Sequence, residues 1–130
     1  MNTFAPMFGK YTPPTTQSSP EGTVISVKHQ FKGPLERTAA EEKMRGIFRD
    51  FAPKAMTDHV ILGHFKGSIQ SGEAFFAISV TREDVLDETA DERWKSLSFL
   101  PEGEVTVNLL TVLPVAVTEQ DLAQAVALQF

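Results

Sequence analysis

Apolar and polar residues alternate along the segment TVISVKHQF, which spans residues 23–31. Ile25, Val27 and Phe31 share one parity, and this period of two is typical of a β-strand with one buried face. The dipeptide Gly33-Pro34 follows, and such a pair is expected to interrupt a strand. The pattern predicts a first strand over Thr23–Phe31.

The next apolar residues recur at helical spacing. They fall at i, i+4, i+7, i+8 and i+11 and are Ala40, Met44, Ile47, Phe48 and Phe51. Thr38 and Glu41 have the spacing of a capping box, in which each side chain satisfies a backbone amide at the helix start. Because proline lacks an amide hydrogen, Pro53 is expected to end this first helix.

Two further strands are expected over His59–Ile69 and Glu73–Arg82, joined by a tight turn at residues 70–72. The segment Asp84–Leu97 then favours a second, acidic helix. Its apolar residues lie three or four positions apart, as one helix edge requires, and are Leu86, Ala90, Trp94 and Leu97. A fourth strand is predicted over Glu104–Leu113, and a last helix is predicted to run from near Thr118 to the C-terminus.

This order of elements is typical of an α+β fold. We predict a ferredoxin-like split βαβ arrangement, with a four-stranded antiparallel sheet, helices on one face and an extra C-terminal helix. Residues 1–22 are expected to form an extended N-terminal arm, because they are rich in Pro, Ser and Thr. Residues 23–130 would form the single α+β domain. The arm either docks on its own domain or a neighbour, or is a loose tail.

Apolar residues occupy both parities of the last three expected strands. A sheet with helices on one face normally alternates, so the second face is expected to need a cover. An isologous homodimer through two sheet faces would provide one. The residues expected at that interface are Val60, Leu62, Phe75, Ala77, Leu110 and Val112. The alternative cover is the chain's own arm and last helix.

Composition narrows the classes of partner. The net charge of −5 disfavours a general binder of nucleic acid or of anionic membranes, because both need a basic surface. No apolar run reaches the eighteen or so residues of a membrane-spanning helix, and no secretory signal is apparent, so a cytoplasmic location is expected. The chain has no cysteine, which excludes disulfides and thiolate metal sites. No cofactor is expected.

The histidines do not have the spacing of a metal site. His59 and His64 are five residues apart on one expected strand, so they would point to opposite faces. The carboxylates of segment 84–97 lack the pattern of a calcium loop and are expected to be a solvated helix face. We therefore predict no metal.

Two short sequences resemble each other, His29-Gln30-Phe31-Lys32-Gly33 and His64-Phe65-Lys66-Gly67. If the first two strands run parallel, both Phe-Lys-Gly ends would emerge at one end of the sheet, beside the start of the first helix. The residues expected to form a cationic pocket there are His29, Lys32, Arg37, His64 and Lys66. The alternative is that these lysines guard strand ends against edge pairing.

No motif of nucleophilic catalysis and no glycine-rich phosphate loop is present. Two functions therefore remain. The first is a non-catalytic homo-oligomeric assembly or accessory module. The second is a binding protein for a small anionic ligand, or a small enzyme, with a His/Lys pocket between sheet and helices or at a dimer interface. The sequence leaves open whether the protein is an enzyme.

Overall fold

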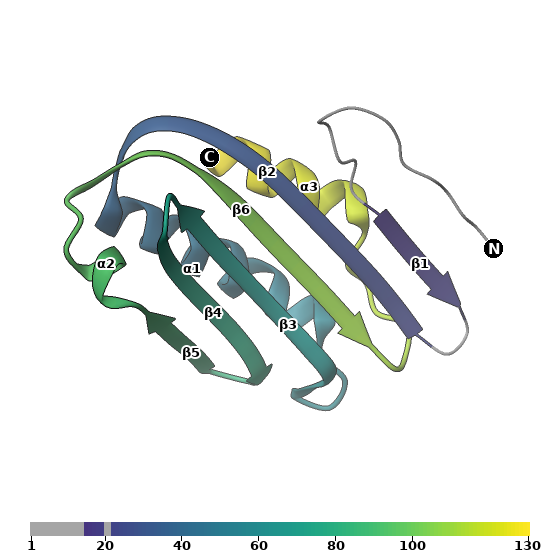
Figure 1. Cartoon of the computed structure of the whole chain (residues 1–130). Helices are drawn as coiled ribbons and strands as arrows, with labels where there is room; N and C mark the ends of the chain where they lie inside the picture. The colour runs from purple at the N-terminus through teal and green to yellow at the C-terminus, as the bar shows by residue number, and fades with distance from the viewer. Residues whose placement is uncertain (1–14, 20–21) are drawn as a thin grey trace.

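In the computed structural model, which describes residues 15–19 and 22–130, the chain forms one antiparallel sheet of six strands in the order β1-β2-β6-β3-β4-β5 (Figure 1). The strands are β1 Thr15–Ser19, β2 Gly22–Glu36, β3 Val60–Ser71, β4 Ala74–Arg82, β5 Val85–Ala90 and β6 Phe99–Thr111. The helices are α1 Arg37–Ala55, α2 Glu92–Lys95 and α3 Glu119–Gln129. No described helix is long and apolar enough to cross a membrane.

The two longer helices lie side by side behind the sheet in Figure 1, with α3 behind β2 and α1 behind the central strands. The short helix α2 follows β5 at the sheet's edge and packs against β4. The opposite face of the sheet, turned toward the viewer in Figure 1, carries no described helix. We call it the open face.

The α+β class predicted from the sequence is confirmed, but the predicted count of four strands is wrong. The expected strands correspond to β2, β3, β4 and β6, and β1 and β5 extend the sheet at its two edges. Both β2 and β3 pair antiparallel with β6, so they run parallel to each other with β6 between them.

Inward-facing side chains form a single core between the sheet and the helices. The predicted helix stripe is confirmed, because all five of its residues are buried. On the sheet side, Phe65 stacks on Phe48 of α1 with ring centroids 4.1 Å apart, and Phe76 stacks on Trp94 at 5.3 Å. Trp94 is fully buried, so it is a packing residue of the core.

A glycine in β3 lets α1 approach the sheet closely. A Cβ atom at Gly67 would lie 2.6 Å from Met44 Cε and 2.7 Å from Phe48 Cε1. Real Cβ atoms do not come this close to other atoms, so Gly67 makes room for the stacking of Phe48 on Phe65.

The strands alternate between buried and accessible residues, although apolar residues occur on both parities as the sequence indicates. In β3, Ile61, Phe65, Gly67 and Ile69 are buried, whereas Leu62, His64, Lys66 and Ser68 are exposed or half-buried. The same alternation holds along β4 and along β6 from Val105 onward. Apolar residues do occur on the open parity, but polar residues outnumber them there.

The segment predicted as an acidic helix is mostly the edge strand β5. Leu86 and Ala90 are four residues apart, a spacing that fits both the helical period and the two-residue period of a strand. Pairing with β4 decides between them, with Leu86 opposite Val80 and Ala90 opposite Phe76. Only Glu92–Lys95 is helical, and the side chain of Asp91 caps this short helix.

The start of α1 differs from the predicted capping box. The N-cap residue is Glu36, and no side chain caps the helix there. Thr38 donates its hydroxyl to the Glu36 carboxylate, and Glu41 turns toward Trp94 instead of toward the backbone. At the other end Pro53 lies inside the last turn, which continues to Ala55.

The last helix begins as predicted, because the hydroxyl of Thr118 accepts a hydrogen bond from the amide of Asp121. The strand β2 is longer than predicted. It passes Gly33-Pro34 through an irregularity between Lys32 and Leu35 and pairs again with β6. Of the expected N-terminal arm, Thr15–Ser19 pairs with β2 as strand β1. The aromatic residues of the arm lie outside the described residues.

Candidate functional site

A row of polar side chains crosses the open face from β2 to β5. The register places Ser26 beside Asn108, Asn108 beside Lys66, Lys66 beside Ser79 and Ser79 beside Asp87. Neighbouring strands are about 4.8 Å apart, so Lys66 and Asp87, two strands apart, are separated by roughly 10 Å at the backbone. No carboxylate of the described residues lies within ion-pair distance of Lys66.

The middle of the open face is hollowed around Lys66. The hollow has a volume of about 350 Å³. Its polar lining consists of Lys66, Ser68, Ser79, Asp87, Thr89, Thr106 and Asn108. Phe75, Ala77 and Ile78 supply the apolar part of the lining. Hydroxyl, amide and ammonium groups therefore surround one shallow depression, with a single carboxylate on its β5 side.

Apolar side chains on the open face lie further along the strands, on either side of this polar row. On one side Val24 pairs with Leu110, and these side chains are 42% and 36% exposed. Leu62 lies half-buried near them on β3. On the other side Phe75 of β4 is 38% exposed. The face thus mixes apolar and polar side chains, and its overall composition is close to that of non-obligate protein interfaces.

Of the residues predicted at a dimer interface, Leu62, Phe75, Ala77, Leu110 and Val112 have the parity of the open face. Phe75 and Ala77 flank the hollow on β4, and Leu110 lies opposite His64 of β3. Val112 continues the parity of Leu110 just beyond β6 and is 56% exposed. Val60 and Leu62 lie at the start of β3, where the pairing with β4 is irregular.

The residues predicted to form a cationic pocket do not meet at one place. His64 and Lys66 lie on the open face, whereas His29 has the parity of the buried residues of β2 and faces the helices. Lys32 pairs with Glu102, and the row of Lys66 meets β2 at Ser26. Lys32 and that row are thus six residues apart along β2, which is about 20 Å.

The two Phe-Lys-Gly sequences lie at different positions along the strand direction, because β3 continues four residues beyond Gly67, to Ser71. Lys66 is therefore in mid-sheet rather than at a strand end. Arg37 is also engaged elsewhere, since its Nε donates to the carbonyl of Leu97 at 2.7 Å and its Nη1 to Glu41 at 2.9 Å.

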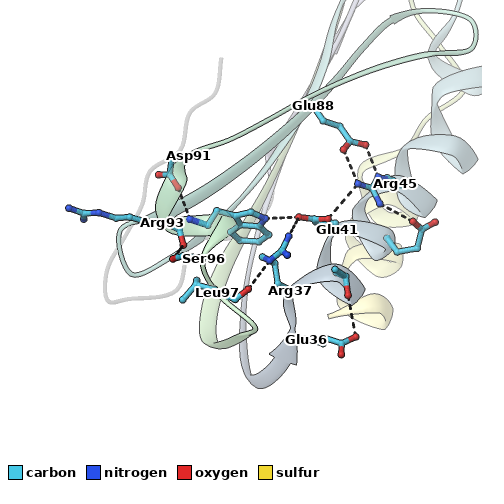
Figure 2. A network of polar contacts seen from close by, with 12 residues as sticks. Glu36, Arg37, Glu41, Arg45, Glu88, Asp91, Arg93, Ser96 and Leu97 are labelled. Atoms are coloured by element: carbon cyan, nitrogen blue, oxygen red, sulfur yellow. Dashed lines mark hydrogen bonds and ion pairs between the residues drawn. The ribbon is translucent and has the colours of Figure 1, made fainter.

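A second polar cluster lies on the helix side of the sheet and is internally paired (Figure 2). Arg45 of α1 donates from Nε and Nη2 to the two carboxylate oxygens of Glu88 in β5, at 2.6 and 2.9 Å. This contact holds the pKa of Glu88 below its ordinary value, because a hydrogen-bonded cation favours the ionised carboxylate. Hydrogen bonds from Arg45 and Arg49 lower the pKa of Glu42 in the same way.

This cluster joins elements rather than presenting a site. Glu41 accepts hydrogen bonds from Trp94 and Arg37 and forms an ion pair with Arg45 at 3.5 Å, so its carboxylate is fully engaged. In the described part of the chain, no three His, Asp or Glu side chains gather in a way that could hold a metal ion. His59 instead contacts Glu83 at the far end of the sheet.

Sequence reasoning missed several residues of the hollow, among them Asn108, Ser79 and Asp87. A usable signal was present for Asn108 and Ser79, because each is a polar residue between two apolar ones in an expected strand. Asp87 lacks this signal, because it is followed by Glu88 and Thr89. Which of them share a row depends on the pairing of β3, β4, β5 and β6, and the sequence pattern does not contain that register.

No protein-family model matches the chain, and no curated protein matches it. Among solved structures, the chain is similar to the Zn(II)-bound YjiA GTPase from E. coli, with 13% identity and a TM-score of 0.46 over 82% of this chain and 30% of that one. A Zn(II)-bound triple mutant of the YjiA GTPase gives 14% identity and a TM-score of 0.42, over 80% and 29% of the two chains. The chain spans less than a third of the length of these structures.

Proposed function

We propose that the protein is a non-catalytic assembly or accessory module that associates reversibly with a second copy of itself through the open face. The observation that supports this most is the exposure of Val24, Leu110 and Phe75 on the one sheet face without a described helix. Apolar residues gathered on an uncovered face commonly mark a protein contact.

The polar centre of the face favours a weak, exchanging dimer over a permanent one. Obligate interfaces resemble a core cut in half, whereas exchanging ones are about as polar as the rest of the protein surface and contain bridging waters. Lys66 and Asp87 lie on one row with Ser79 between them. An isologous contact that brings Lys66 of one copy to Asp87 of the other is self-complementary in charge.

The arrangement of β2, α1 and β3, two parallel strands with β6 between them, supports a further part of the proposal. The module is a variant of the ferredoxin-like split βαβ arrangement, enlarged by an edge strand on each side.

Sedimentation velocity over a range of concentrations tests the self-association. The average mass should rise with concentration in the parent chain and stay at one chain's mass in Phe75→Glu and in Leu110→Glu. Leu128→Glu is the matched control, because Leu128 is 76% exposed on α3, away from the open face. A parent chain that keeps the mass of one copy at millimolar concentration would refute the proposal.

A second candidate is the binding of a small anion in the hollow, favoured by a lysine among hydroxyl and amide groups. Inorganic phosphate should then raise the melting temperature of the parent chain and not that of Lys66→Ala. Lys28→Ala is the control, because Lys28 is on the same face but does not line the hollow. An equal response of all three chains to phosphate would exclude this candidate.

A further inference from the structure

The strand β5 ends the sheet on one side and offers backbone hydrogen-bonding groups along its outer edge. The amide of Asp91 donates to the carbonyl of Phe75, which makes 75 and 91 a hydrogen-bonded pair of the β4–β5 ladder. In an antiparallel ladder such pairs alternate, so Asp87 and Thr89 bond inward to β4. The amides and carbonyls of Leu86, Glu88 and Ala90 consequently point away from the sheet.

These outward groups have no partner among the described residues. In that part of the chain β5 pairs only with β4, and no other backbone or side-chain hydrogen bond reaches the outward groups of Leu86, Glu88 or Ala90. Figure 1 shows the outer side of β5 uncovered by the ribbon of any described helix. An uncovered strand edge is a template for one more strand.

An apolar hollow adjoins the same edge on the helix side. It has a volume of about 400 Å³ and lies between the last turns of α1 and the start of β5. Its lining is mostly apolar, from Phe48, Ala52, Pro53, Met56, Val80, Val85 and Leu86, and its charged residues are Arg49, Glu83 and Asp84. Leu86 faces this side of the sheet, because it pairs with the buried Val80. A side chain placed opposite Leu86 on an added strand would lie next to the hollow, since cross-strand neighbours are about 5 Å apart.

The charge of the β5 edge determines which kind of added strand it would attract. Asp87 points to the open face, and no described cation pairs with it. Asp84 lies in the turn just before β5. A basic side chain opposite Asp87 would be attracted on the open face, whereas an acidic one would be repelled.

The edge of a second copy fits poorly. If two copies of β5 paired antiparallel through their outward groups, a two-fold axis at the middle residue would place Glu88 opposite Glu88. The flanking carboxylates would also approach each other, and like charges directly opposite destabilise a pair of strands.

We infer that the β5 edge binds an extended, basic segment of another protein, which adds as a seventh strand. Two neighbouring residues of that segment carry the recognition. An apolar side chain enters the hollow beside Leu86, and a lysine or arginine next to it faces Asp87 on the other side of the sheet. This surface is separate from the apolar patch of Val24 and Leu110 and shares only Asp87 with the face proposed for self-association, and the inference does not depend on that self-association.

Panning a displayed library of random heptapeptides against the full chain tests the inference. Peptides with a basic residue next to an apolar one should be enriched, and one such synthetic peptide should bind in calorimetry. Ala90→Pro removes an outward amide at an edge position where proline is tolerated, and binding should be lost. Asp87→Lys should weaken binding about tenfold or more, as expected for reversal of a facing charge. Glu102→Lys, exposed on β6, is the charge control and should bind like the parent chain.

A variant outside β5 distinguishes a loss of peptide binding from a loss of folding. Met56→Glu places a carboxylate at the half-buried lining of the hollow and should weaken the same peptide while circular dichroism stays unchanged. Failure to enrich any peptide, or binding that survives Ala90→Pro, would overturn the inference. A dimer abolished by Ala90→Pro but not by Leu110→Glu would also overturn it, because the edge would then belong to a second copy. Peptide binding that appears only after deletion of residues 1–14 would assign the edge to the chain's own N-terminal segment.

Discussion

The indole Nε1 of Trp94 donates a hydrogen bond of 2.7 Å to Glu41 Oε2, and this contact joins residues 53 positions apart in the sequence. Trp94 is fully buried between α2 and β4, so its N–H has no access to solvent. Glu41 is held in place by Arg37 and Arg45 (Figure 2). The contact therefore gives the buried indole N–H a hydrogen-bond acceptor at the border of the core.

Removal of this acceptor should destabilise the protein. In Glu41→Ala the buried indole N–H loses its partner, and the free energy of unfolding should fall by about 2–3 kcal/mol. Glu41→Gln retains an acceptor and should cost about half as much. Urea unfolding followed by Trp94 fluorescence measures both. Glu42→Ala, which removes a more exposed carboxylate of the same helix turn, is the control and should change the value by less than about 1 kcal/mol.

The pairing of Arg45 with Glu88 predicts a specific dependence of stability on pH. The pKa of Glu88 is lowered in the folded protein from its ordinary value of 4.5. The pair therefore contributes fully above pH 4.5, and its contribution is lost as the pH falls through the lowered pKa of the folded state. The contribution is about 1 kcal/mol, because the pair is partly exposed.

Glu88→Gln should consequently lie below the parent chain in stability at pH 7 and approach it as the pH falls from 4.5 toward 2.5. Unfolding in urea at a series of pH values gives this difference. An equal difference at pH 7 and pH 2.5 would show that the loss comes from packing or from β-strand preference rather than from the charge.

Two glycines should respond in opposite ways to the same substitution. Gly67→Ala places a Cβ against Met44 and Phe48 and should cost about 1–3 kcal/mol. Gly46→Ala on α1 meets no atom within 4 Å and should stabilise the protein by about 0.5–1 kcal/mol. Thermal unfolding of the two variants distinguishes them. A stabilised Gly67→Ala would show that α1 can move away from the sheet without loss.

Two threonines with similar sequence contexts should also differ. Thr118 caps α3 by accepting from the amide of Asp121, and Thr118→Ala should cost about 1 kcal/mol. Thr38 accepts no such bond and only donates to Glu36, so Thr38→Ala should change the free energy of unfolding by less than about 0.5 kcal/mol. Equal losses in the two variants would contradict the observed helix starts.

The same contrast shows how far the sequence could predict the fold. The stripe from Ala40 to Phe51 was predictable, because five apolar residues at helical spacing have one common solution. The capping box was not, because Glu41 had a choice between a backbone amide and the indole of Trp94, and that tryptophan arrives from a distant segment. The local spacing of residues contains no information on a hydrogen-bond donor 53 residues away.

The candidate site was predictable only in its parts. The parity of Phe75, Leu110 and Lys66 follows from alternation, and all three lie on the open face as that parity requires. Their neighbours could not be derived, because β3 extends to Ser71 and thereby moves Lys66 about 20 Å from the row of Lys32. The polar character of most of that face does not follow from the few apolar residues on it, because serines, threonines and Asn108 stand between them.

The sequence by itself determined the α+β class, the buried stripe of the first helix, the start of the last helix and the inward parity of four strands. Each depends on residues close together in the chain, where periodicity and capping act directly. The tertiary structure alone decided that Val85–Ala90 is a strand, which residues form the row of Lys66 and Asp87, and that the outer edge of β5 lies beside an apolar hollow. These features arise from pairing between distant segments. The hydrogen bonds of such pairing connect backbone groups irrespective of sequence, and the register is determined only when the whole core is packed.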